Sequence, residues 1–228
     1  RTSGTTTSQS GLGWRTIKAC FEDSEGTFTT SDNSTLYTSV TTSNTAAIVT
    51  TKFTSKQKAA WEFLLEADSS GDECSTFGAA RGPPTSRCYS SSPDLWMRRA
   101  YNGYLYALGA STGQVMDKVK PGDTVRVEFD GKAGTISFGL NGSDPEVAFT
   151  GITDDVYPAC GSYRNGVSIR LTKVEVFDTL DDAGEDEISA VSAFARPSAD
   201  IKWVLHEDNF MSTRDHCLLC PAVPKGAK

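Results

Sequence analysis

Residues suited to holding another polypeptide are concentrated in one short stretch, residues 81–99. Four arginines and two large aromatic residues lie within it, although the chain carries a formal net charge of −7. Arg, Tyr and Trp dominate binding hot spots because they bury a large area and carry directional polar groups. Cations clustered in an acidic chain favour an acidic or mixed peptide partner. The candidate contact residues of this stretch are Arg81, Pro83, Arg87, Tyr89, Trp96 and Arg98.

Other interpretations of these residues stay open. Trp96 equally suits a core position at the start of a strand, and Arg98 suits a solvated strand position. Three tyrosines surround the turn-forming pair Asn102-Gly103 just downstream. Tyr104 and Tyr106 share one strand face, which we expect to be packed, whereas Tyr101 stands next to the turn and is the better candidate for exposure.

Residues for catalysis or metal binding are scarce. The two histidines, His206 and His216, lie outside the strand-rich part of the chain. No nucleophile elbow, phosphate-binding loop or zinc-protease motif is present. The pair Cys217-x-x-Cys220 has a spacing that zinc accepts, but a lone pair of this kind is more often two ordinary thiols. We therefore expect no enzyme activity, no cofactor and no bound metal.

Composition narrows the class of partner and the compartment. The acidic balance, with a sequence pI near 4.9, disfavours nucleic acid. The apolar runs are too short to cross a bilayer, so no membrane insertion is expected. Six cysteines in 228 residues are too sparse for a disulfide scaffold, which favours a cytoplasmic location. Because the chain starts without Met, we expect a piece of a larger multidomain protein.

The middle of the chain alternates apolar and polar residues with the period of two that strands show. Turn residues, such as those at 131–134 and the pair Asn141-Gly142, recur about every 8–12 residues, as in an antiparallel sandwich. No helical periodicity of useful length is present. We therefore predict an all-β fold, an antiparallel β-sandwich. The alternating apolar sets include Trp61, Phe63, Leu65 and Ala67; Val125, Val127 and Phe129; Ile136, Phe138 and Leu140; Val167, Ile169 and Leu171; and Leu36, Thr38 and Val40.

The ends of the chain differ in composition from the middle. Residues 1–13 are small and polar, typical of a disordered tail, and the sandwich is predicted over 14–177. Residues 178–200 read as an acidic linker or loop. The C-terminal extension, 201–228, holds one apolar run at 201–205 that suits an added strand or a docked tail.

From Trp61 onward, the order of short motifs resembles that of the SPRY domain, over roughly residues 35–177. No single motif is diagnostic, but the ordered set is specific. The motifs are Trp61-Glu62-Phe63, Phe77-Gly78-Ala79-Ala80-Arg81, Trp96, Asn102-Gly103-Tyr104-Leu105-Tyr106, Gly122-Asp123-Thr124-Val125, Gly134-Thr135-Ile136-Ser137-Phe138, Leu140-Asn141-Gly142, Val147-Ala148-Phe149 and Val156-Tyr157-Pro158-Ala159.

This resemblance implies a concanavalin-like jelly roll that binds peptides on a loop-rich surface at one end. Tyr89 matches the tyrosine that contacts peptide in the SOCS-box members of the family. Tyr163 or Arg164 falls where those members place a second, bulky contact residue, after the strand that contains Tyr157-Pro158. The chain carries Arg or Tyr where those relatives carry Trp, so the resemblance implies the surface but not their peptide specificity.

The resemblance also suggests a context. The run from Trp96 to Gly103 looks most like SPRY domains of giant ubiquitin ligases, which implies partner or substrate recognition within a large E3 ligase. Two alternatives remain: a structural domain packed within a large assembly, such as a calcium-release channel, and, less favoured, a carbohydrate-binding sandwich.

Overall fold

The computed structural model describes residues 13–22, 27–68 and 75–178. These residues form fourteen strands and no helix, and the strands build two antiparallel sheets. The predicted all-β antiparallel sandwich is therefore confirmed. Within the same ranges, no helix is present that could cross a membrane.

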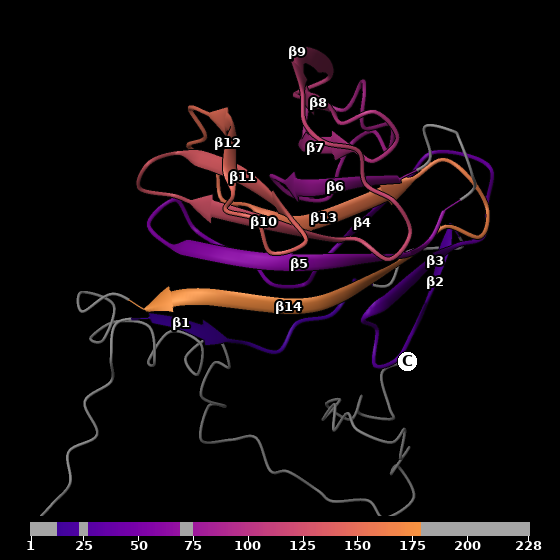
Figure 1. Cartoon of the computed structure of the whole chain (residues 1–228), viewed down its shortest axis with the longest axis horizontal. Coiled ribbons are helices and arrows are strands. Elements are labelled where there is room, and N and C mark those ends of the chain that lie inside the picture. Colours follow the sequence, from indigo (N-terminus) through magenta and orange to yellow (C-terminus); the bar gives the residue numbers. More distant parts are fainter. Residues whose placement is uncertain (1–12, 23–26, 69–74, 179–228) are drawn as a thin grey trace, which may run out of the picture. The chain divides into compact units, whose positions relative to one another are not determined.

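The larger sheet has eight strands in the order β12-β11-β10-β5-β14-β3-β2, with β1 paired to β14. Figure 1 shows the long strands β5 and β14 side by side along it. Pairing of Gly13 with Asp178 brings the two ends of the sandwich sequence together, one residue beyond each limit predicted for it. The strands are β1 (Gly13–Thr16), β2 (Phe28–Ser31), β3 (Leu36–Ser39), β5 (Lys58–Ala67), β10 (Thr124–Asp130), β11 (Thr135–Leu140), β12 (Glu146–Thr150) and β14 (Ser168–Asp178).

The smaller sheet has six strands in the order β4-β13-β6-β7-β8-β9. Its strands are β4 (Thr45–Ile48), β6 (Ser75–Ala80), β7 (Leu95–Arg99), β8 (Tyr104–Ala107), β9 (Ala110–Val115) and β13 (Tyr157–Ser162). Because Tyr157 pairs with Ala80 and Ser162 with Ser75, the loops after β6 and after β13 leave from opposite ends of the sheet. We call these the Arg81 end and the Tyr163 end.

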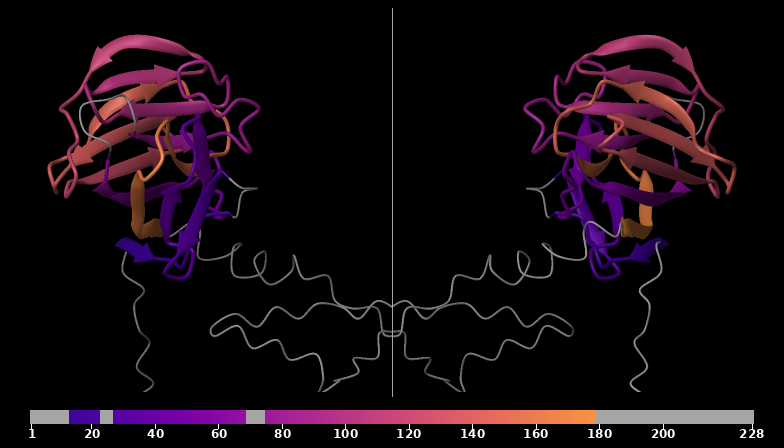
Figure 2. Two further views of the ribbon diagram at one scale, coloured as in Figure 1. Left: turned by 90° about the vertical axis from the view of Figure 1, so that its right-hand side faces the viewer. Right: turned by 90° about the vertical axis from the view of Figure 1, so that its left-hand side faces the viewer.

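The core fills the space between the two sheets. Apolar side chains of β5 and β10, including Trp61, Phe63 and Val127, have no exposed surface and meet inward residues of the smaller sheet, such as Phe77. Figure 1 shows the strands of the larger sheet across the view, and Figure 2 looks along them from both sides. The alternation of buried and partly buried residues along β5 and β10 is the one expected from the sequence.

Two local predictions are corrected by the register. In β3 the inward residues are Tyr37 and Ser39, not the expected set with Leu36, because the Tyr37 hydroxyl reaches polar partners between the sheets. Because Pro158 has no N–H to donate, the sequence Tyr157-Pro158 predicts the entry to an edge or terminal strand, yet β13 lies between β4 and β6. The sheet accepts Pro158 because its carbonyl faces Val49, just past the end of β4, where a missing N–H interrupts no ladder.

The hairpin from β11 to β12 turns where the sequence predicts it. Asn141 and Gly142 have φ angles of 52° and 82°, and the Ser143 N–H donates to the Leu140 carbonyl at 3.0 Å. Positive φ at both central residues is what a type I′ turn requires, and Asn and Gly tolerate it at low cost.

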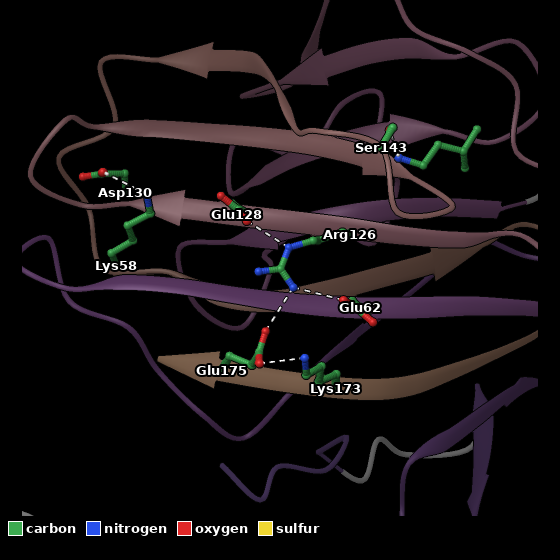
Figure 3. A network of polar contacts seen from close by, with 9 residues as sticks. Lys58, Glu62, Arg126, Glu128, Asp130, Ser143, Lys173 and Glu175 are labelled. Atoms are coloured by element: carbon green, nitrogen blue, oxygen red, sulfur yellow. Dashed lines mark hydrogen bonds and ion pairs between the residues drawn. The ribbon is translucent and has the colours of Figure 1, made fainter. Parts of the chain in front are cut away.

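Charged residues on the outer face of the larger sheet are paired with one another (Figure 3). The Arg126 guanidinium donates to Glu62, Glu128 and Glu175 at 2.9–3.0 Å, and Lys173 lies 2.7 Å from Glu175. Burial acts to lower the pKa of Arg126, but these hydrogen bonds outweigh burial and raise it. The charges around Arg126 are therefore engaged with one another.

The predictions for both tails lie outside the described residues. This applies to the disordered N-terminal tail, apart from Gly13 in β1, to the acidic linker beyond Asp178, and to the strand at 201–205. It also applies to the thiol pair Cys217 and Cys220.

Candidate functional site

The loop 81–94 folds back over the outer face of the smaller sheet. Its Tyr89 is only 8% exposed and packs edge-on against Tyr106, with ring centroids 5.0 Å apart. The Tyr89 hydroxyl accepts a hydrogen bond from Nη1 of Arg99 at 3.2 Å. Tyr89 was predicted as a partner contact; the structure corrects this to a residue that fixes its own loop onto the sheet.

Arg99 organises the aromatic residues on this outer face. Its guanidinium carbon lies 5.3 Å from the ring centroids of both Tyr104 and Tyr106, and its Nε donates to Oδ1 of Asn102 at 2.8 Å. Tyr106 is buried as expected, but Tyr104 is 41% exposed because the pairing with β9 is irregular between these two residues. The cationic and aromatic groups here are used to build the face.

Two further predicted contact residues point into the sandwich. Trp96 is 4% exposed and belongs to the core between the sheets, with the Arg81 guanidinium 5.7 Å from its ring centroid. Arg98 is 1% exposed and its Nη2 donates to the Asp117 carbonyl at 2.5 Å. Both are corrected from surface contacts to interior residues, since β7 alternates Trp96 and Arg98 inward and is covered on its other face by loop 81–94.

Arg81, Pro83 and Arg87 remain exposed on this loop. The Arg81 side chain donates to the Pro93 carbonyl at 2.8 Å. Both the N–H and the hydroxyl of Thr85 donate to Oδ2 of Asp94, at 2.8 and 2.6 Å. These bonds, led by the hydroxyl of Thr85, hold the pKa of Asp94 below its usual value. These bonds fix the shape of the loop, and they include the side chain of Arg81, which is also exposed to solvent.

The Tyr163 end presents apolar side chains that the fold leaves open. Three of the seven large exposed hydrophobic residues in the described ranges lie there: Val40, Tyr101 and Tyr163, at 40–45% exposure. Each tyrosine carries a cation over its ring: Lys118 at 5.4 Å from Tyr101 and Arg164 at 5.5 Å from Tyr163. We call these five residues the Tyr163 rim.

Backbone contacts place the members of the rim on one end. The Gly166 N–H donates to the Ser39 carbonyl, which joins the loop after β13 to the end of β3 next to Val40. The Ala100 N–H donates to the Ser75 carbonyl, opposite Ser162 in the register. Since β13, β6 and β7 are neighbours, Tyr101 and Tyr163 follow strands about 10 Å apart.

A buried polar cluster supports the rim from below. The Tyr37 hydroxyl lies 2.6 Å from the Ser162 hydroxyl and also bonds the Thr45 hydroxyl, while Thr45 bonds Ser162 at 2.9 Å. Burial, with the nearby Cys160 thiol, raises the pKa of Tyr37 to about 12, although these hydrogen bonds act to lower it. The cluster joins β3, β4 and β13 directly beneath Tyr163.

Comparison with known proteins identifies the family to which this chain belongs. The family model described as SPRY domain matches residues 11–174. The chain belongs to the SPRY domain family. SPRY domains are in general protein–protein interaction modules that bind protein or peptide ligands.

Solved SPRY structures share the fold. The crystal structure of the SPRY domain of human HERC1 is 23% identical, with a TM-score of 0.59, and the match covers 74% of this chain and 99% of that one. The TRIM65 PSpry domain is 13% identical, with a TM-score of 0.53, and the match covers 69% of this chain and 92% of that one. At these identities the likeness shows the fold alone.

The sequence predicts one binding surface, but in this SPRY domain the candidate contact residues lie in separate places. Arg81 and Tyr163 follow opposite ends of β6 and β13, so their attachment points are about 17 Å apart, the length of a six-residue strand. Tyr89, in the loop that leaves the Arg81 end, lies over the face of the smaller sheet. Tyr101, Tyr163 and Arg164 are exposed and share the Tyr163 end, but they do not join Arg81, Pro83 or Arg87.

Two members of the rim were not predicted as contact residues: Val40, which the sequence placed in an alternating strand set, and Lys118. Lys118 is one of three charged residues in the segment 117–120. Only the hydrogen bond from the Val119 N–H to the Ala100 carbonyl brings it beside Tyr101. In the part of the chain that the structure describes, no three His, Cys, Asp or Glu side chains gather as metal ligands.

Proposed function

We propose that this SPRY domain is a non-catalytic module that binds a protein or peptide partner through the Tyr163 rim. The observation that carries the proposal is the gathering of three large exposed hydrophobic side chains at one end of the sandwich, above a rigid polar cluster. Exposed apolar groups on a well-ordered support are typical of interaction surfaces. Tyrosines are suited to this role because they bury a large area at a low cost in conformational entropy.

The charge of the rim indicates the kind of partner. Lys118 and Arg164 stand over the two tyrosines, so aromatic faces and cations alternate along the end. Such a surface favours an extended segment that carries acidic residues beside an apolar one. The long-range field of an acidic chain would slow this association, so specificity would depend on the local contacts at the rim.

The other surfaces support the proposal less well. The outer face of the larger sheet uses its charges in internal pairs around Arg126. At the Arg81 end, Tyr89 and Trp96 are buried and the Arg81 side chain is bonded to the loop. What remains exposed there is polar, apart from Pro83 and Leu108.

A peptide selection tests the proposal. The 228-residue chain is used to select binders from a random peptide library, and the strongest peptide is synthesised and titrated by fluorescence anisotropy. Because hot-spot residues each contribute more than about 1 kcal/mol, we expect the double substitution Tyr163→Ala, Arg164→Ala to raise Kd at least tenfold. The selected peptides should be enriched in acidic and apolar residues.

The matched control is the pair Leu108→Ala, Lys132→Ala, which removes one exposed hydrophobic side chain and one exposed cation away from the rim. This pair should leave Kd unchanged. Equal binding by the rim variant and the wild type would overturn the assignment of the surface, and loss of binding in an Arg81→Ala, Arg87→Ala variant alone would move the site to the Arg81 end.

We propose further that the domain recognises partners on behalf of a large E3 ubiquitin ligase. Support comes from the run Trp96 to Gly103, which resembles SPRY domains of giant ligases. Purification of the native protein from cytosol, followed by a ubiquitin-transfer assay with E1 and E2 enzymes, tests this. Absence of any catalytic ligase region in the same chain or complex would reject it without affecting the assignment of the rim.

A further inference from the structure

A cleft of about 360 Å³ opens between the edges of the two sheets, beside the Lys118 side of the Tyr163 rim. One wall comes from β7 and the segment that leaves β9, and the other from β11 and the turn before β12. Its size falls within the range of ligand-binding clefts, about 300–1,000 Å³. Its accessible surface is mostly polar, and Val115 and Leu140 are among the apolar residues that line it.

A buried cation lies at the base of this cleft. Arg98 is 1% exposed, and a guanidinium offers five N–H donors. Within the described residues, its Nη2 donates to the Asp117 carbonyl, while its Nε is buried without a hydrogen-bond partner. Burying a charged donor without a partner is costly, so this side chain has unmet capacity for an acceptor from outside the chain.

Carboxylates surround the mouth of the same cleft. Asp117, Asp144 and Glu146 are exposed and line it, so three negative side chains stand over the one positive side chain of Arg98. A free anion would be repelled at the mouth, and a simple cation would be repelled at the base. The arrangement suits a ligand that places a neutral carbonyl deep in the cleft and positive charge outside it.

We propose that this cleft binds a basic peptide segment, in which a carbonyl oxygen accepts hydrogen bonds from Arg98 and flanking Lys or Arg side chains contact Asp144 and Glu146. The amide of Gln or Asn provides such a carbonyl on a short stem. The cleft thus has the opposite charge preference to the Tyr163 rim, and the two sites accept different partners.

The test uses the full chain and the fluorescein-labelled probe acetyl-Gly-Ala-Lys-Gln-Lys-Ala-Gly-amide, titrated by anisotropy at low and high salt. We expect binding that weakens as salt rises. The same peptide with both Lys replaced by Glu should bind at least tenfold more weakly. Replacing Gln by Leu, which removes the carbonyl, should also weaken binding at least fivefold.

Protein variants locate the contact. The substitutions Asp144→Asn and Glu146→Gln, made together, should weaken the probe at least fivefold, whereas Glu22→Gln with Asp154→Asn makes the same change in net charge elsewhere and should not. In ¹H–¹⁵N spectra, the Nε–H signal of Arg98 should shift on binding, which reads out this side chain without mutating it.

The proposal is overturned if the Glu-substituted peptide binds equally well, if the two double variants behave alike, or if the Arg98 signal does not move at saturation. A Tyr163→Ala, Arg164→Ala variant should bind this probe like the wild type. Its failure to do so would show that the probe binds the rim, which would reject the cleft but not the proposed function.

Discussion

The two ends of this sandwich carry similar residues and use them differently. At the Arg81 end, the aromatic side chains are buried, since Tyr89 covers the sheet and Trp96 packs in the core, although Arg81 and Arg87 stay exposed. At the Tyr163 end, tyrosines and cations stay outside, above a buried polar cluster. The difference follows from loop length, since 14 residues between β6 and β7 can fold back over a sheet face and the short connection after β13 cannot. Hot-spot residue types therefore indicate binding only where the chain leaves them uncovered.

The largest loss of stability should follow substitution of Trp96, which packs in the core at the Arg81 end. Trp96→Ala removes a nearly buried indole, and we expect a loss of about 3–5 kcal/mol in the free energy of unfolding. Urea denaturation monitored by circular dichroism measures it. Leu108→Ala, at an exposed position of the same end, is the control and should change stability little. A small change in the free energy of unfolding for Trp96→Ala would mean that Trp96 is not a core residue at this end.

The buried polar cluster below the Tyr163 rim should make the stability of the domain fall at high pH. The pKa of Tyr37 is about 12 in the folded protein against 10.0 for the ordinary group. Below pH 10 the phenol is protonated in both states, and between about pH 10 and 12 only the unfolded chain loses the proton. Stability should fall by about 2–3 kcal/mol across that window.

Tyr37→Phe separates this effect from the titration of lysines and Cys160. The variant should be less stable at pH 9, because it loses the hydrogen bonds to Thr45 and Ser162, and its disadvantage should shrink as the pH rises. Denaturation curves at pH 9, 10 and 11 provide the comparison. Parallel stability profiles for the two proteins would contradict the buried, neutral state of Tyr37.

A smaller effect is expected from the hydroxyl that fixes loop 81–94. Tyr89→Phe keeps the ring on Tyr106 but removes the acceptor of the Arg99 hydrogen bond. We expect a loss of about 1–2 kcal/mol, measured by thermal denaturation, and faster amide exchange within the loop. Unchanged exchange would show that the loop is held by its other contacts alone.

The smallest effect on stability should come from the rim itself. Tyr163→Ala should alter the free energy of unfolding by no more than about 0.5 kcal/mol, because Tyr163 is an exposed residue whose ring lies beneath Arg164. The same denaturation assay measures it. A loss comparable to that of Trp96→Ala would remove the contrast between the two ends.

Much of the fold could be predicted from the sequence. The period of two along β5 and β10 identified the inward residues, such as Phe63 and Val127, and the pair Asn141-Gly142 located a hairpin. These signals are local, since a strand with one buried face and one solvated face must alternate. The ordered motifs from Trp61 onward identified the family.

The exposure of the candidate residues could not be predicted in this way. All five residues of β7 are buried, because the larger sheet covers one face and loop 81–94 covers the other. A strand covered on both faces loses the alternation that would have separated Trp96 and Arg98 from surface positions. The grouping of Val40 with Tyr101 and Tyr163 also depends on the pairing of strands distant in the sequence.

The sequence by itself determined the strands, the turns and the family, because these depend on patterns within a few residues. Only the tertiary structure decided which arginines and tyrosines face solvent, which end of the sandwich each one occupies, and that Arg98 lies at the base of an acidic cleft. Those properties depend on which segment folds over which face, and that is a long-range outcome of packing.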